Sequence, residues 1–203
     1  MPMLTSLLLA AGESRRMGRP KALLTLPSGE TFLDEASHAV RACAIPLAIA
    51  IVGTALAETL AARDHGFAAI IVNESPQKGQ LLSVQLGLSH LILNAPSASG
   101  TLLHLVDNPG QLQDRMGMVM AEVERTGGGG LIAAAFQREP GHPLWLPRRL
   151  WEGVLAWAGP DGLRGFIAST GETVSLVETG LESTHWDIDT PEAYRQLVNP
   201  APD

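Results

Sequence analysis

Cationic side chains crowd into one short segment near the N-terminus of a chain whose net charge is −7. An apolar run ends at Gly12, and Arg15, Arg16, Arg19 and Lys21 then follow within seven residues. A glycine turn after a buried strand exposes backbone N–H groups that can cradle phosphate oxygens. Arginine adds forked donors suited to phosphate, and lysine adds a compact charge. The segment therefore indicates a polyphosphate site, with a solvated basic loop as the alternative.

The common phosphate-binding fingerprints do not account for this segment. Neither G-x-x-x-x-G-K-[ST] nor G-x-G-x-x-G occurs in it. Any phosphate site here must therefore have another architecture.

Apolar runs alternate with helical patterns along almost the whole chain, so the elements that position this segment can be predicted. Strands are predicted at 4–10, 46–52, 68–72, 101–106, 131–136 and 173–177. Helices are predicted at 31–42, 55–65, 79–93, 112–125, 150–157 and 162–169, and after Pro191, with Thr31 and Asp34 forming an N-terminal cap. Such alternation predicts an α/β sheet with helices on both faces. Ligands bind such sheets at the carboxyl ends of their strands, so 12–21 and 107–109 should lie on the same edge.

Composition narrows the class of protein. The 203 residues are 45% hydrophobic, enough for a buried core. The acidic balance argues against a nucleic-acid partner. Cys43 is the only cysteine, which excludes an internal disulfide and a cysteine-based zinc site and fits a cytoplasmic location. No membrane partner is expected: the apolar start of the chain has no basic n-region and is interpreted as a strand, and no apolar run is long enough to span a bilayer.

The N-terminal segment resembles a family signature. Residues 9–24 match L-A-A-G-x-S-x-R-M-G-x-P-K-x-L-L without a break, the signature of the MobA-like nucleotidyltransferases. Further stretches similar to family motifs are "NESPQKGQLLSVQLGL" with Asn73, Gly79, Ser83 and Gly87, "HLVDNPG" with Asp107, "GHP" at 141–143, "GPDGLRGFI", and "DIDTPEAY" at 187–194. The matching pieces occur in family order and cover most of the chain.

This resemblance implies a fold and a reaction. The implied fold is a three-layer α/β/α sandwich with a mostly parallel mixed sheet, as in nucleotide-diphospho-sugar transferases. Residues 1–203 are expected to form one nucleotidyltransferase domain, with a disordered tail at 199–203. The implied reaction attacks the α-phosphorus of a nucleoside triphosphate with an acceptor phosphate and releases pyrophosphate, with Mg²⁺ as the cofactor.

Roles for individual residues follow from the same resemblance. The implied catalytic residues are Arg16, Lys21 and Asp107. The implied nucleotide-binding residues are Leu9, Ala10, Ala11, Gly12, Ser14, Gly18, Asn73, Gly79 and Ser83. His142 either contacts the acceptor or fixes a loop. Asp107 is the leading metal ligand, and the second is Asp187 or Asp189, which face the same way if the stretch is extended.

Two short stretches of the sequence bear on the identity of the two substrates. The Ala-Ala-Gly triplet resembles molybdopterin cytidylyltransferases, and the Cβ of Ala11 should favour the smaller pyrimidine, so CTP is predicted over GTP with a molybdopterin-like phosphorylated acceptor. Asn108 stands where the family usually has Gln, and Gly110 is also unusual. Two alternatives therefore stay open: transfer to a sugar or polyol phosphate, and a non-catalytic protein that binds nucleotide or delivers a cofactor.

Overall fold

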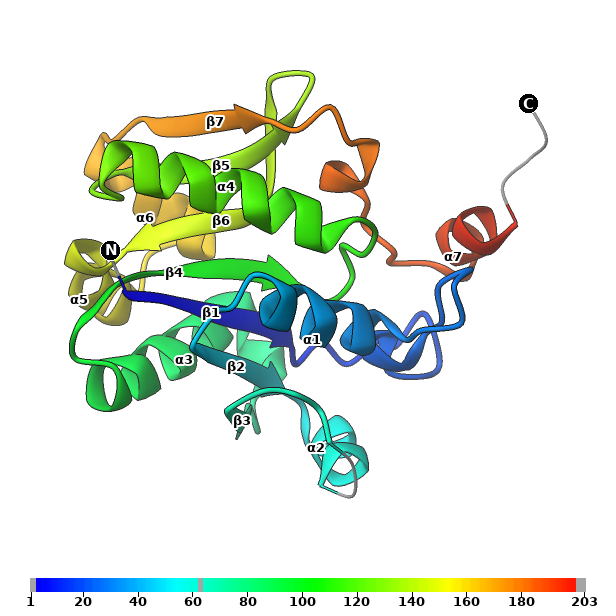
Figure 1. Ribbon diagram of the computed structural model, residues 1–203. Helices are drawn as coiled ribbons and strands as arrows, with labels where there is room; N and C mark the ends of the chain where they lie inside the picture. Colours follow the sequence, from blue (N-terminus) through cyan, green and yellow to red (C-terminus); the bar gives the residue numbers. More distant parts are fainter. Residues whose placement is uncertain (1–2, 62–63, 200–203) are drawn as a thin grey trace.

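One seven-stranded sheet organises the protein. The computed structural model describes residues 3–61 and 64–199. The strands are β1 (Met3–Ala10), β2 (Leu47–Val52), β3 (Ala69–Val72), β4 (Ala98–Leu105), β5 (Leu131–Phe136), β6 (Glu139–Pro147) and β7 (Val174–Glu178). Their order is β3-β2-β1-β4-β6-β5-β7 (Figure 1). Only β6 runs antiparallel to its neighbours, so the predicted mostly parallel mixed sheet is confirmed.

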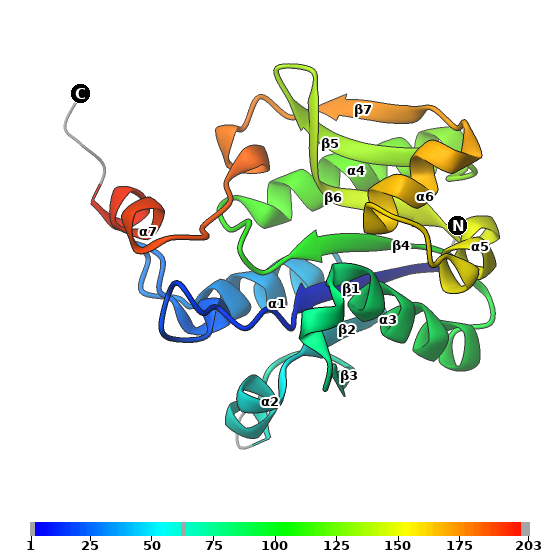
Figure 2. The same cartoon turned by 180° about the vertical axis from the view of Figure 1, so that it is seen from behind.

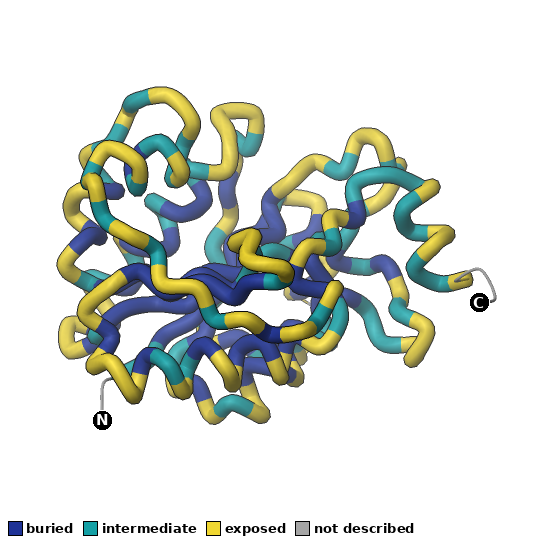
Figure 3. The backbone as a smooth tube through the Cα atoms, turned by 90° about the horizontal axis from the view of Figure 1, so that it is seen from above, coloured by how far each residue is buried: buried dark blue, intermediate teal, exposed yellow. Residues whose placement is uncertain are grey.

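Helices cover both faces of this sheet. They are α1 (Phe32–Ala42), α2 (Thr54–Leu60), α3 (Gln80–Asn94), α4 (Leu112–Thr126), α5 (Trp151–Ala156), α6 (Gly162–Thr170) and α7 (Pro191–Val198). Helices α1 and α4 cover one face, and α3, α5 and α6 cover the other (Figures 1 and 2). Each face has its own apolar core, and the buried residues gather along the central strands (Figure 3). The three-layer α/β/α architecture is therefore confirmed. Within the described ranges, no helix is long and apolar enough to cross a bilayer.

Most element boundaries follow the local sequence signals. The Thr31 hydroxyl accepts the Asp34 N–H, and the Asp34 carboxylate accepts the Thr31 N–H, so α1 starts with a capping box. The helix predicted at 55–65 already ends at Leu60, and residues 62–63 of that prediction lie outside the described residues. Asn199 caps the C-terminus of α7, and the rest of the predicted tail also lies outside the described residues.

Strand β6 was missed by the sequence analysis, which predicted no strand or helix between residues 136 and 150. Its prolines at 140, 143 and 147 hide the strand, because proline cannot donate to a β-ladder. The structure accommodates them with an irregular register between Ala133 and Ala135 of β5. Because β6 runs against its neighbours, His142 near its start lies at the edge where the parallel strands end.

The C-terminal segment forms contacts with the residues that follow the cationic loop, which comprises residues 12–21. The Tyr194 hydroxyl donates to the Thr25 carbonyl at 2.9 Å, and its ring packs edge-on against Phe32. The Thr190 side chain caps α7, which starts with Pro191. These contacts bring the residues just before α7 back to the carboxyl edge of the sheet, although almost the whole chain separates them from β1.

A buried histidine lies inside the sheet near this edge. His104 on β4 is fully buried, and one ring nitrogen lies 2.8 Å from the Ser6 hydroxyl. The other ring nitrogen has no hydrogen-bond partner among the described residues. Burial, together with the charges of His142 and Arg115, lowers the pKa of His104 to about 3. The ring is therefore neutral in the folded protein at neutral pH.

This histidine should make the protein less stable in mild acid. Below about pH 6.5 the unfolded chain protonates the ring, whereas the folded protein does so only near pH 3. The free energy of unfolding should fall across that window by up to about 1.4 kcal/mol per pH unit for this proton. Chemical denaturation from pH 7 to pH 4 measures the slope, which His104→Gln should reduce. His90→Gln on α3 is the control, and an unchanged slope in His104→Gln contradicts the assignment.

Candidate nucleotide and metal site

A cleft of about 600 Å³ opens at the carboxyl edge of the sheet. It lies beside the ends of β1 and β4 and the start of α3. The predicted residues that line it are Leu9, Ala10, Ala11, Gly12, Ser14, Arg16, Lys21, Asn73, Gly79, Ser83, Asp107 and Asp189. Residues from four distant parts of the chain therefore meet in one cleft, as expected for a parallel sheet.

The cationic loop folds back on Ser14. This residue has a positive φ of 50°, and its carbonyl accepts the N–H groups of Met17 and Gly18 at 2.9 and 3.1 Å. Its hydroxyl accepts the Lys21 N–H at 3.1 Å. Gly18 has a φ of +68°, a conformation that favours glycine. The loop is thus a closed turn that fixes where the Lys21 side chain starts.

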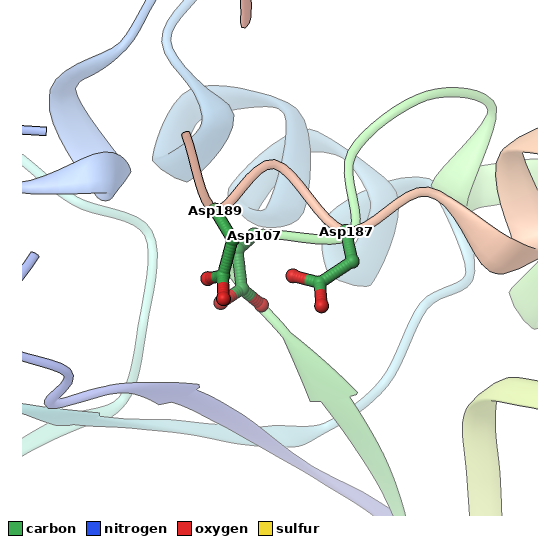
Figure 4. A group of neighbouring side chains, drawn as sticks. All are labelled: Asp107, Asp187 and Asp189. Carbon is green, nitrogen blue, oxygen red and sulfur yellow. The ribbon is translucent and has the colours of Figure 1, made fainter. Parts of the chain in front are cut away.

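Three carboxylates converge opposite this loop. Asp107 follows β4, while Asp187 and Asp189 lie on the segment that leads to α7 (Figure 4). One oxygen from each carboxylate lies within 4.8 Å of the others. The Ile188 N–H donates to the Asp107 carbonyl at 2.9 Å and joins the two segments directly. The predicted convergence of these three aspartates is therefore present.

Two cations of the loop contact this acidic cluster. Lys21 Nζ lies 2.7 Å from Asp107 Oδ2 and also pairs with Asp189, which in turn pairs with Arg16. Burial alone would lower the pKa of Lys21, but hydrogen bonds and charges from Asp107 and Asp189 raise it above its ordinary value. The hydrogen bond from Lys21 lowers the pKa of Asp189. Lys21 and Asp189 are therefore both ionised at neutral pH.

Asp187 differs from its two neighbours because no hydrogen bond or ion pair is present on its carboxylate among the described residues. Burial, followed by the charges of Asp107 and Asp189, raises its pKa. This carboxylate therefore lacks the cation that the other two already have. Carboxylate oxygens are the ligands that Mg²⁺ prefers, so the donor set fits a hard divalent cation held by Asp107 and Asp187 or Asp189.

The opposite wall of the cleft is built from the loop after β3. Asn73 and Ser83 are both buried, and the Asn73 amide donates to the Ser83 hydroxyl at 2.9 Å. The Asn73 carbonyl oxygen accepts the Ser75 N–H at 2.9 Å. Gly79, with a φ of +94°, starts α3 with open space beside its Cα. Hydrogen bonding thus fixes this wall while leaving room for a ligand.

Three of the predicted site residues do not line the cleft in the described part of the chain: Gly18, His142 and Asp187. Gly18 shapes the loop from its exposed side. The half-buried His142 ring lies 3.3 Å from the Leu103 carbonyl at the sheet edge. The sequence analysis missed Gly53 and Thr54, which line the cleft after β2. Their position after a predicted strand was the signal that could have identified them.

The chain is similar to two curated proteins over almost its whole length. The chain is 28% identical to the nicotine blue oxidoreductase of Paenarthrobacter nicotinovorans, over 98% of both proteins. It is 29% identical to the molybdenum cofactor guanylyltransferase of Rhizobium meliloti (strain 1021), over 94% of this chain and 88% of that protein.

Solved structures share the fold over the full length. Rv0371c from Mycobacterium tuberculosis H37Rv superimposes with a TM-score of 0.80 at 24% identity, covering 97% of this chain and 98% of its own. The same protein has also been solved in complex with manganese. The family described as "MobA-like NTP transferase domain" matches residues 6–174. The chain therefore belongs to the MobA-like NTP transferase family and is a nucleotidyltransferase.

Proposed function

We propose that this nucleotidyltransferase moves a nucleoside monophosphate, with CTP as the preferred donor and Mg²⁺ as the cofactor, onto a phosphorylated small molecule. One observation carries the proposal: the cationic loop meets Asp107 and Asp189 in one cleft, with Asp187 beside them and Lys21 Nζ 2.7 Å from Asp107 Oδ2. Nucleotidyl transfer needs both signs of charge at one place, because anionic phosphates must be gripped while a divalent cation is held beside them.

The reaction joins two phosphates. An acceptor phosphate oxygen forms a bond to the α-phosphorus of the triphosphate, the bond from that phosphorus to the bridging oxygen breaks, and pyrophosphate leaves with the electron pair. A phosphomonoester is already ionised near neutral pH, so the site requires no proton-transferring histidine. Lys21 and Arg16 bind the triphosphate and stabilise the charge that develops on the leaving pyrophosphate.

Asp107 and Asp187 would hold the cation, while Asp189 holds the two basic side chains. This division rests on the ion pairs, since Asp189 is paired with both Arg16 and Lys21 and Asp187 carries neither. A bound divalent ion supplies Lewis-acid stabilisation of phosphate charge and alignment of the two reactants. Lys21 pairs with two of the carboxylates, Asp107 and Asp189, and the triphosphate would offer it a further anionic partner.

The choice of base is proposed to depend on Ala11. Ala11 is buried and lines the cleft. The backbone of Gly53 lies close beside it, because a Cβ added to Gly53 would be 3.4 Å from the Ala11 carbonyl oxygen. The methyl group of Ala11 reduces the space that a purine would need at the backbone, and this favours CTP. The R. meliloti relative is named a guanylyltransferase, so GTP is the competing donor in the assay.

The acceptor is proposed to be molybdopterin or a related phosphorylated cofactor. The sequence resemblance and the name of the R. meliloti relative support it. The cytoplasm is the proposed location, because a free thiol on Cys43 and a nucleoside triphosphate substrate both fit it.

A pyrophosphate-release assay tests the reaction. CTP, GTP, ATP and UTP are each combined with molybdopterin, a sugar phosphate or a polyol phosphate, with Mg²⁺ or with EDTA. Release that requires CTP, molybdopterin and Mg²⁺ is the expected result. A parallel arm with nicotine blue and NADH or NADPH tests for an oxidoreductase reaction, the activity in the name of the P. nicotinovorans relative. Reduction without pyrophosphate release would overturn the proposal.

Removing the cleft lysine should slow the reaction strongly. Lys21→Ala should lower kcat by roughly two to three powers of ten, on the scale of other preorganised electrostatic groups. The chain has only one other lysine, Lys78, which is exposed and does not line the cleft, so Lys78→Ala is a matched control. Steady-state pyrophosphate release measures both variants. Unimpaired turnover in Lys21→Ala contradicts the assigned role.

Removing one methyl group at the base site should relax nucleotide choice. Ala11→Gly should increase kcat/KM for GTP relative to CTP, because the purine gains space beside the backbone. Competition between the two nucleotides in one reaction measures this ratio. Ala98→Gly, at a buried alanine at the far end of β4, controls for lost stability. An unchanged CTP/GTP ratio in Ala11→Gly would refute the role of Ala11.

A further inference from the structure

A fully buried arginine lies behind the acidic cluster. Arg115 on α4 has no exposed surface, and burial lowers its pKa to about 10, so it remains charged at neutral pH. Its guanidinium donates to the carbonyls of Asn108, Gly110 and His142 at 2.8–3.1 Å. It also donates to the side-chain oxygen of Asn108. The buried guanidinium therefore forms its hydrogen bonds with the loop that follows Asp107 and with the start of β6.

The Asn108 side chain links this arginine to the C-terminal segment. Its oxygen accepts from Arg115, so its amide nitrogen must point the other way. That nitrogen donates to the carbonyls of Ser183, Thr184 and Trp186, the first two at 3.1 and 3.3 Å. Asn108 is itself buried, at 5% exposure. One carboxamide thus holds three carbonyls of a segment about 75 residues away.

These three carbonyls immediately precede the acidic residues of the segment. Asp187 follows Trp186 directly, and Asp189 follows two residues later. Asn108 follows Asp107 directly. The hydrogen bonds from its amide to residues 183–186, called the tether below, therefore link Asp107 to the segment that carries Asp187 and Asp189. The opposite side of this loop is also held, because the Glu35 carboxylate accepts the N–H groups of Gly110 and Leu112 at 2.9–3.3 Å.

We propose that Asn108 and Arg115 are positioning residues: Arg115 orients the Asn108 carboxamide, and this carboxamide holds residues 183–186 so that Asp187 and Asp189 face Asp107. The metal-binding consequence rests on the proposed function, whereas the tether itself does not. Partners behind metal ligands commonly change metal affinity by 10–100-fold. The position that departs from the family pattern therefore has a defined task in this chain.

Asn108→Asp tests the proposal with almost no change in shape. The new carboxylate can still accept from Arg115, but it cannot donate, so three carbonyls lose their donor and face a negative charge. Hydrogen exchange measured by mass spectrometry should show the Ile188 region exchanging about tenfold faster or more. Titration with Mn²⁺, followed by electron paramagnetic resonance, should show affinity weakened by about 10–100-fold. Arg115→Lys, which keeps the charge but loses the fork, should change both readouts in the same direction.

A carboxamide of the same kind on the other face of the sheet provides the control. The Gln85 amide donates to the carbonyls of Val154, Leu155 and Trp157 at 3.0–3.3 Å, and Gln85 does not line the cleft. Gln85→Glu therefore makes the same chemical change away from the acidic cluster. It should loosen α5 without changing Mn²⁺ affinity or the exchange of the Ile188 region.

The outcomes separate the inference from the proposed function. Wild-type protein that fails to bind Mn²⁺ overturns the proposed metal site and the positioning role with it. Normal Mn²⁺ binding by the wild type and equally tight binding by Asn108→Asp overturns the positioning role alone. Unchanged exchange near Ile188 in Asn108→Asp overturns the tether, whatever the metal does. Loss of both properties in Asn108→Asp and Arg115→Lys, but not in Gln85→Glu, supports the inference.

Discussion

Charge balance at the carboxyl edge of the sheet is the constraint on which the site depends. Three carboxylates within 4.8 Å of one another repel, and separate segments of the chain must bring them together. Lys21 and Arg16 offset part of that repulsion, but Asp187 keeps a raised pKa and no cation of its own among the described residues. The divalent cation that we propose beside Asp107 and Asp187 would offset the repulsion that Lys21 and Arg16 leave.

The fold supplies the stiffness that this balance requires. Parallel strands place Gly12, Asn73 and Asp107 at one edge, because each follows the carboxyl end of its own strand. The C-terminal segment is held from two sides, by Tyr194 against the loop that contains Thr25 and by the tether from Asn108. A similar fold can accept other substrates, so the residues of the cleft, rather than the sheet, must set the choice of base and acceptor.

The sequence predicted the strands, the helices and the cationic loop, because each has a local signal of periodicity, capping or glycine spacing. It did not predict β6, because the prolines of that segment are unfavourable in a strand. The segment forms a strand because it pairs with β4 on one side and β5 on the other. The sequence also left the pairing of the aspartates open. Lys21 meets Asp107 and Asp189 across 86 and 168 residues, and the tether from Asn108 to Trp186 spans 78. Such contacts depend on tertiary packing, which local patterns do not record.

A crystal structure with a non-hydrolysable CTP analogue and Mg²⁺ would show whether the cleft holds the nucleotide and the ion as proposed. We expect the ion between Asp107 and Asp187, the Lys21 ammonium on a phosphate oxygen, and the cytosine beside Ala11. Nucleotide bound elsewhere, or a cleft in which Lys21 keeps both carboxylates and no ion is present, would contradict this expectation.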